Sequence, residues 1–320
     1  MRYRAFGRLG WQVSEIGFGT WGMGGWSGAD DALAAEALDR AAALGCNFFD
    51  TALAYGAGHS EQLVGAMLRR HPDTRLYVAS KVPPKNLKWP GRASTPAADA
   101  FPANHIRAAT ETSLRNLGVD RIDLQQLHVW SDAWVDDDGW RELDRLKTAG
   151  VIGAVGISVN RWEPANVLAA LETGLVDAVQ VVYNVFDQAP EDALFPACRA
   201  RGVAIIARVP FDEGSLAGTL GPGTTWPEGD FRNIYFTPEN LRATLARVDA
   251  LSRDLPAGMS MPEAALRFVL ENEDVGTVIP GMRRPAHVEA NLAVPGGRRL
   301  TTAELQTLRK HRWDRGYEVE

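Results

Sequence analysis

Eight short apolar segments, rich in β-branched and aromatic residues, recur along this chain with helical patterns between them. They lie at residues 16–18, 47–49, 76–79, 122–127, 152–157, 178–182, 203–207 and 275–279. Strands that alternate with helices are typical of βαβ units, in which the strands are parallel and the helices cover them. Eight such units close a (β/α)8 TIM barrel. The pattern therefore predicts an α/β barrel.

Helical periodicity and glycine stops mark the connecting helices. Apolar residues three and four apart run from Leu33 to Leu44 and from Ile106 to Leu117, and a glycine follows each run. Residues 3–13 read as two short strands joined by a turn, and Thr301 with Glu304 opens a helix within residues 300–313. We expect an N-terminal β-hairpin and a C-terminal helix outside the barrel wall.

Length and composition favour one domain over residues 1–320. The chain is 45% hydrophobic and 23% charged, which suits one large core. Barrels commonly exceed the usual domain size, and no linker rich in Pro, Gly and Ser separates two self-contained sets of strands and helices. We therefore expect a single barrel domain.

Charge and cysteine usage exclude several classes of protein. The 34 basic and 40 acidic side chains are intermixed, give a net charge of −6 and form no long Lys/Arg run that tracks a nucleic-acid backbone. Cys46 and Cys198, the two cysteines, lack the spacing of a disulfide framework or a metal site. We expect no nucleic-acid partner and no metal.

The start of the chain lacks the apolar core of a signal peptide, and no apolar run is long enough to span a bilayer. We therefore expect a cytoplasmic protein with no membrane partner. No pattern in the sequence indicates an oligomeric state.

Four ionisable residues stand at or just past the ends of predicted strands. They are Asp50, Tyr55, Lys81 and His128. Singly, each has an ordinary structural explanation: a helix cap, a loop aromatic, a solvated strand end or a buried histidine. Together they lie where a parallel barrel carries its chemistry, at the carboxyl ends of its strands.

These residue types suit a proton donor. A phenol has a pKa of about 10 and is a poor acid at neutral pH unless a nearby cation favours the phenolate. Lys81 supplies that cation, and Asp50 holds the ammonium and helps it lower the pKa of Tyr55. His128 orients a substrate carbonyl and donates a hydrogen bond to its oxygen. Because no side chain supplies a hydride, carbonyl reduction by this group implies a nicotinamide cofactor.

The chain resembles the aldo-keto reductase family through residues 48–56, Ser60-Glu61, Ser80-Lys81 and Leu127-His128. Residues 156–160, 180–184 and 279–291 fall where that family binds its cofactor. The resemblance implies a barrel closed at its bottom by the hairpin. It also implies reversible reduction of a small-molecule aldehyde or ketone, with a hydride from NADPH or, less often, NADH and the proton from Tyr55.

The resemblance further implies cofactor contacts at six positions: Ser158, Asn160, Gln180, Arg208, Arg283 and Asn291. The first three match the family's nicotinamide carboxamide ligands. Arg208 stands where many relatives carry a tyrosine that stacks on the nicotinamide, and a guanidinium also stacks on a ring or pairs with an acid. Tyr183 is left out, because an aromatic residue at a strand end is as often packing.

The coenzyme preference stays open in the sequence. Arg283 or its neighbour Arg284 precedes a predicted helix after the eighth strand, where barrels commonly bind phosphate, and suits a 2′-phosphate. The family's usual Gln and Glu before Asn291 are replaced by His287 and Ala290. NADPH is therefore expected, with NADH as an alternative.

Two long connections and a group of tryptophans bear on substrate and cofactor access. Residues 82–103 form a wall of the substrate pocket or a tolerated surface insertion, and the glycine-rich residues 210–238 suit a cofactor clasp. The tryptophans at predicted loops and strand ends shape an apolar pocket or pack the loops. They are Trp21, Trp26, Trp89, Trp130 and Trp134.

Two other functions compete with reduction. A non-catalytic, nucleotide-sensing barrel subunit binds cofactor and a protein partner without turnover, as some members of this family do. A lyase or isomerase uses Lys81 as a Schiff base or Asp50 as a general base. The four strand-end residues favour the reductase over both.

Overall fold

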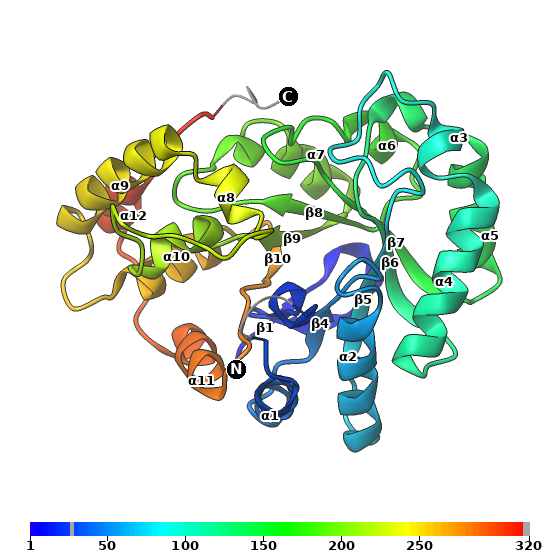
Figure 1. Ribbon diagram of the computed structural model, residues 1–320, viewed down its shortest axis with the longest axis horizontal. Coiled ribbons are helices and arrows are strands. Elements are labelled where there is room, and N and C mark those ends of the chain that lie inside the picture. The colour runs from blue at the N-terminus through cyan, green and yellow to red at the C-terminus, as the bar shows by residue number, and fades with distance from the viewer. Residues whose placement is uncertain (26–28, 316–320) are drawn as a thin grey trace.

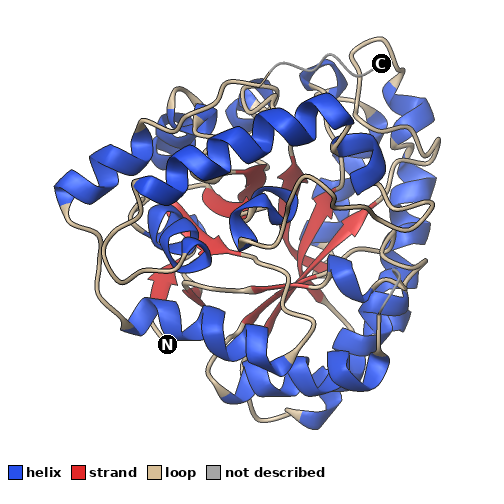
Figure 2. Cartoon of the chain, turned by 60° about the vertical axis from the view of Figure 1, so that its left-hand side comes forward, coloured by secondary structure: helices blue, strands red, loops and turns tan. Residues whose placement is uncertain are grey.

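One barrel of eight parallel strands forms the centre of the molecule. The computed structural model describes residues 1–25 and 29–315, and in these residues the eight strands pair in chain order from β3 to β10. Backbone bridges of Ile16 with Val278 and of Gly19 with Gly281 join the first strand to the last. Figure 2 shows the strands encircled by helices. The predicted barrel is confirmed.

The barrel strands are short and begin close to the predicted positions. They are β3 (Phe18–Gly19), β4 (Phe48–Asp50), β5 (Tyr77–Val82), β6 (Ile122–Leu127), β7 (Ile152–Ser158), β8 (Ala178–Val182), β9 (Ala204–Arg208) and β10 (Val275–Val278). All adjacent pairs are parallel, so the carboxyl ends of the strands share one rim of the barrel.

Helices surround this barrel, as the ribbon in Figure 1 shows. They are α1 (Asp31–Ala43), α2 (His59–Arg70), α3 (Ala97–Ala100), α4 (Ala103–Leu117), α5 (Asp138–Thr148), α6 (Leu168–Glu172), α7 (Leu194–Arg201), α8 (Arg232–Tyr235), α9 (Pro238–Arg253), α10 (Met261–Leu270), α11 (Pro285–Ala293) and α12 (Thr302–Arg309). Local chemistry sets several ends: the Asp30 carboxylate caps α1, and Gly118, at a φ of 67°, ends α4.

The N-terminal hairpin closes one end of the barrel, as expected. Its strands β1 (Tyr3–Ala5) and β2 (Gln12–Ser14) are antiparallel. Phe6 and Val13 are fully buried against the inward-facing apolar residues of the strands, and the Phe6 ring lies 5.3 Å from that of Phe48. The packing of Phe6 against Phe48 fills this end of the barrel with apolar side chains.

The C-terminal helix is confirmed, and it is shorter than expected. Thr301 and Glu304 form a complete capping box at the start of α12, which ends at Arg309. The two long connections also contain helical turns, since α3 lies within residues 82–103 while η5 (Asp212–Ala217) and α8 lie within residues 210–238. Within the described residues, no helix combines the length and apolar character needed to cross a membrane.

Strand alternation separates two cores. Phe49 and Val78 face outward and pack under the helices, whereas Phe48 and Ala79 face inward, in the cluster that includes Phe6. The inward-facing residues of the strands are apolar near the hairpin. The inward-facing residues that follow them, toward the carboxyl rim, are polar, and this polar end of the barrel is the candidate site.

Candidate active site

A layer of polar side chains fills the barrel near its carboxyl rim. Each belongs to an inward-facing position two or four residues beyond an apolar member of the inner core. The layer consists of Asp50, Lys81, Gln126, Ser158, Gln180 and Arg208. All are buried except Arg208, which is half-buried. Burial of this many polar groups requires that they pair with one another.

Lys81 is the centre of this layer. Its ammonium donates hydrogen bonds to Asp50 Oδ2 at 2.6 Å, to the Thr51 carbonyl at 2.9 Å and to the Tyr55 hydroxyl at 3.1 Å. The Lys81 side chain is fully buried and that of Asp50 is 3% exposed. One buried cation therefore joins a carboxylate to a phenol, as the sequence led us to expect.

Two glutamines hold the other oxygen of Asp50. Gln180 Nε2 donates to Asp50 Oδ1 at 2.8 Å, and Gln126 Nε2 donates to the same oxygen at 3.2 Å. These bonds fix the carboxylate so that Oδ2 faces Lys81. Gln126 is absent from the predicted site, although its place two residues beyond Leu124 in β6 put it on the inward face. Gln180, expected at the cofactor, lies against Asp50.

A tight turn after β4 presents Tyr55 to Lys81. Gly56 has a φ of 64°, and a Cβ there would meet the Gly24 carbonyl oxygen at 2.6 Å, so only glycine allows this approach. Ser60 donates a hydrogen bond to Thr20 at 2.6 Å, and Ser80 donates one to Glu61 at 2.5 Å. The Ser60-Glu61 pair thus fastens the start of α2 beneath the turn.

His128 completes the group from the end of β6. Its ring lies edge-on to Tyr55, with centroids 5.5 Å apart, and edge-on to Trp89 at 4.7 Å. No described residue hydrogen-bonds its buried Nδ1. The structure therefore brings all four predicted catalytic residues together and adds an aromatic neighbour from the 82–103 connection.

Burial and charge set the protonation of this group. Burial raises the pKa of Tyr55, and the neighbouring Lys81 charge opposes this rise, whereas Asp50 adds to it. Burial works against charge on Lys81, yet Asp50 and Tyr55 leave its pKa above the ordinary value. The expectation that Asp50 helps to lower the Tyr55 pKa is wrong, because a negative charge disfavours a second negative charge nearby.

His128 is held neutral. Burial, followed by the charges of Lys81 and Arg208, lowers its pKa well below the ordinary value of about 6.5. A neutral imidazole still donates one hydrogen bond and carries no charge to repel the adjacent cations. Tyr55 and His128 are thus both neutral, proton-bearing groups at the same rim.

Asn160, one of the predicted cofactor contacts, has its side-chain amide hydrogen-bonded to other protein groups. Its Nδ2 donates to the carbonyls of Gly91 and Trp130 at 2.8 and 3.0 Å and to Glu163 at 2.7 Å, while its Oδ1 accepts from the Gly91 amide at 3.1 Å. The amide that was expected to hold a carboxamide is used to tie the 82–103 connection to the loop after β6. Ser158, at the end of β7, stays within the polar layer.

The other predicted cofactor residues, Arg208, Arg283 and Asn291, belong to the last two strand–helix units of the barrel. Arg208 ends β9, and its Nη2 donates to the Val159 carbonyl at 3.0 Å. Arg283 precedes α11, its side chain lies beside Gly22, and Asn291 is buried within that helix. Together with the positive end of the α11 dipole, these arginines fit an anionic dinucleotide.

The tryptophans divide between packing and site. Trp130 and Trp134 are 1% and 4% exposed and pack edge to face, which supports the packing alternative for both. Trp89 and Trp21 are 47% and 37% exposed, and the Trp89 ring contacts His128. Trp26 lies outside the described residues. Tyr183 is buried, and its hydroxyl donates a hydrogen bond to Glu191.

Fold and site together define a β/α barrel with a buried lysine–carboxylate pair beside a phenol, an arrangement suited to proton transfer at a carbonyl. The model of the aldo/keto reductase family matches residues 15–312. The chain therefore belongs to the aldo/keto reductase family, whose members are oxidoreductases that use nicotinamide cofactors and act on small carbonyl compounds.

Individual relatives agree with this assignment. The NADH-specific methylglyoxal reductase of Escherichia coli (strain K12) is 28% identical over 88% of this chain and 89% of its own. An aldo-keto reductase of Schizosaccharomyces pombe, named with NADP(+), is 29% identical over 87% and 83%. The solved aldo-keto reductase AKR11C1 of Bacillus halodurans, in its holo form, superimposes with a TM-score of 0.80 at 28% identity, over 99% of this chain and 98% of that one.

Proposed function

We propose that this protein reduces an aldehyde or ketone with a hydride from a nicotinamide cofactor and a proton from Tyr55, reversibly. The observation that carries the proposal is the position of Lys81, 2.6 Å from Asp50 and 3.1 Å from the Tyr55 hydroxyl at the carboxyl rim of the barrel. Chemistry in barrels of this kind occurs at that rim.

Each residue has a distinct role in the proton transfer. Tyr55 donates its proton to the carbonyl oxygen, and the Lys81 ammonium stabilises the phenolate that remains. Asp50, fixed by its two glutamines, keeps Lys81 charged and in place. Neutral His128 donates a hydrogen bond to the same substrate oxygen as negative charge develops there. A bound nicotinamide cofactor supplies the hydride for the carbonyl carbon.

We propose that the cofactor lies along the β7 to β10 side of the rim. Ser158 and Gln180 suit the carboxamide end, because both offer polar groups inside the barrel, and Arg208 suits the face of the nicotinamide. Arg283 and Asn291 suit the adenosine end beside α11. Asn160 stays a proposed carboxamide ligand, and its hydrogen bonds to the Gly91 and Trp130 carbonyls also suit a role as a loop anchor.

NADPH is the proposed coenzyme, with NADH as the alternative. Arg283 and Arg284 stand at the start of α11, and a guanidinium there favours a 2′-phosphate. Relatives named for NADH and for NADP(+) are about equally similar to this chain, at 28% and 29% identity. Because the Arg283 guanidinium would pair with the 2′-phosphate that only NADPH carries, Arg283→Ala should raise the KM for NADPH more than the KM for NADH.

The test is oxidation of NADPH and NADH, followed by absorbance, with a panel of aldehydes, ketones, quinones and keto-sugars. Wild-type turnover that is lost in Tyr55→Phe supports the proposal. Cofactor binding without turnover on any substrate would favour the non-catalytic, nucleotide-sensing alternative. Borohydride trapping of a substrate on Lys81 would favour a Schiff-base lyase.

A further inference from the structure

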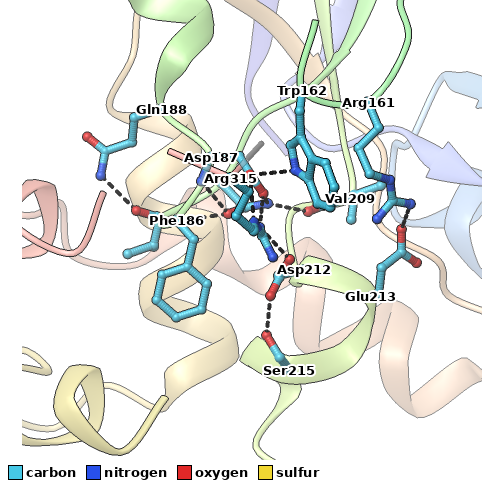
Figure 3. A network of polar contacts seen from close by, with 12 residues as sticks. Arg161, Trp162, Phe186, Asp187, Gln188, Val209, Asp212, Glu213, Ser215 and Arg315 are labelled. Carbon is cyan, nitrogen blue, oxygen red and sulfur yellow. Dashed lines mark hydrogen bonds and ion pairs between the residues drawn. The ribbon is translucent and has the colours of Figure 1, made fainter. Parts of the chain in front are cut away.

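Arg315, near the C-terminal end of the described chain, is a buried cation at the catalytic rim. Its side chain is 4% exposed and forms ion pairs with Asp187 and, at 2.7 Å, with Asp212. It also donates a hydrogen bond to the Tyr235 hydroxyl at 2.6 Å. Figure 3 shows Arg315 between the two carboxylates. We call Arg315, Asp187 and Asp212 the Arg315 clamp.

The clamp joins the connections that follow three successive strands. Asp187 follows β8, and Asp212 follows β9. The Trp162 indole, from the connection after β7, donates to Asp187 Oδ1 at 3.0 Å. Asn184 bridges the last two connections, because its Nδ2 donates to Asp187 Oδ2 at 2.9 Å and to the Val209 carbonyl at 3.1 Å. Arg315 and its partners thus link the three connections at the part of the rim that lies beside Arg208.

The segment that the clamp holds has a strained backbone. Seven non-glycine residues of the described chain have a positive φ, and four of them lie in or against the clamp: Trp162 (59°), Val209 (56°), Asp212 (44°) and Glu213 (55°). Such a φ is especially unfavourable for β-branched Val209. Strained residues persist only where surrounding contacts hold them, and they concentrate at functional sites.

Side-chain contacts on both sides hold this strained turn. Arg315 forms an ion pair with Asp212 Oδ1, and Ser215 donates a hydrogen bond to Asp212 Oδ2 at 2.7 Å. The next residue, Glu213, forms an ion pair with Arg161. The turn directly follows Arg208, the last residue of β9. Barrels commonly bind phosphate in the loops after their seventh and eighth strands, and β9 is the seventh strand in the barrel order.

We propose that Arg315 is a positioning residue for cofactor binding, which holds residues 209–217 in the conformation that receives the dinucleotide. The proposal rests on the proposed function, since it assumes that a nicotinamide cofactor occupies this side of the rim. Arg315 acts through the turn, without contacting the reacting atoms. A turn that is already ordered loses less conformational entropy when the cofactor binds.

Charge adds a second reason for the clamp. Asp187 and Asp212 are both buried beside a site that receives an anionic dinucleotide. The Arg315 cation between them offsets their mutual repulsion and their repulsion of the cofactor phosphates. The planar guanidinium reaches both carboxylates and a phenol at once, whereas the ammonium of a lysine is a single point charge.

Three variants of the full-length chain test the proposal. Arg315→Met removes the cation, and Arg315→Lys keeps the charge without the planar fork. Arg312→Met is the matched control, because Arg312 lies in the same segment but pairs with Asp192 and Asp314, both of which are more than half exposed. Thermal melting confirms that each variant is folded.

Two measurements are made on each variant. Hydrogen exchange of residues 209–217 without nucleotide reports the order of the turn independently of any activity. Quenching of tryptophan fluorescence by NADPH and NADH gives the two dissociation constants, and kcat is measured at saturating cofactor.

For Arg315→Met we expect faster exchange in residues 209–217, a dissociation constant raised about tenfold and a kcat close to that of wild type. Arg315→Lys should lie between wild type and Arg315→Met, and Arg312→Met should match wild type. Unchanged exchange and affinity in folded Arg315→Met and Arg315→Lys would overturn the proposal. If the wild type binds neither nucleotide, the proposed function fails before any substitution is made, and the cofactor role of Arg315 fails with it.

Discussion

Lys81 Nζ lies 3.1 Å from the hydroxyl oxygen of Tyr55, although the two residues are 26 positions apart. The ammonium also lies 4.8 Å from the centre of the phenol ring. Burial makes the phenolate costly, and Lys81 is the nearby cation that reduces this cost. The contact therefore decides whether Tyr55 can act as an acid, and the first two predictions follow from it.

Tyr55→Phe removes the proton donor and leaves the ring in place. We expect kcat for carbonyl reduction to fall roughly 10²–10⁴-fold, the usual contribution of a positioned general acid. The dissociation constant for the cofactor should change little, because the lost hydroxyl faces Lys81. Steady-state kinetics and fluorescence titration separate the two effects. A variant as active as wild type would remove Tyr55 from the mechanism.

Lys81→Met leaves the Asp50 carboxylate buried without its counter-ion. We expect the free energy of unfolding to fall by about 3–5 kcal/mol, as is typical when one member of a buried ion pair is removed. The control is Arg70→Met, because Arg70 pairs with Asp39 on the surface and should contribute only about 0–1 kcal/mol. Urea denaturation at neutral pH measures both variants, and equal losses would contradict the prediction.

His128→Asn should reduce the sensitivity of the fold to mild acid. The folded protein keeps His128 neutral, whereas the unfolded chain takes up a proton below a pH of about 6.5. The free energy of unfolding therefore falls as the pH drops below this value and through the lower pKa of the folded state. One such group changes it by at most about 1.4 kcal/mol per pH unit.

The measurement for His128 is urea denaturation of wild type and variant at pH 7 and pH 5. Wild type should lose more stability than His128→Asn over this interval. Parallel losses in the two proteins would show that His128 is not held neutral by the fold.

Asn160→Ala tests whether this amide anchors a loop or binds the cofactor. The substitution leaves the Gly91 amide and carbonyl without this partner, whereas the Trp130 carbonyl keeps its hydrogen bond from Asn166 at 3.2 Å. Each buried group that loses its partner costs about 1–3 kcal/mol. We expect a lower melting temperature and a higher KM for the carbonyl substrate, since Trp89 is two residues from Gly91. A cofactor affinity weakened without loss of stability would instead support the predicted role of Asn160 as a cofactor ligand.

Much of this architecture was readable in local sequence signals. Strand alternation places Phe48 and Asp50 on the same face of β4, and Ala79 and Lys81 on the same face of β5, so the inward positions of Asp50 and Lys81 follow from a period of two. Glycine at position 118 and the capping box at Thr301 mark helix ends for equally local reasons. These signals depend on neighbouring residues only.

Other assignments depended on which distant groups meet. Gln126 lies 76 positions from the Asp50 that it holds, and nothing near it in the chain reveals that partner. Asn160 occupies a position that suited a cofactor ligand, yet the nearby Gly91 and Trp130 backbones take up its amide. Side-chain type and spacing did not reveal these backbone partners.

The sequence by itself determined the alternation of strands and helices, the hairpin and the four residues at the strand ends, because strand period, helix caps and turns are encoded locally. Only the tertiary structure decided which polar groups satisfy one another, as Arg315 shows by pairing with Asp187 across 128 positions. The physical reason is that hydrogen bonds and ion pairs depend on distance in space, and a closed barrel brings remote segments to one rim.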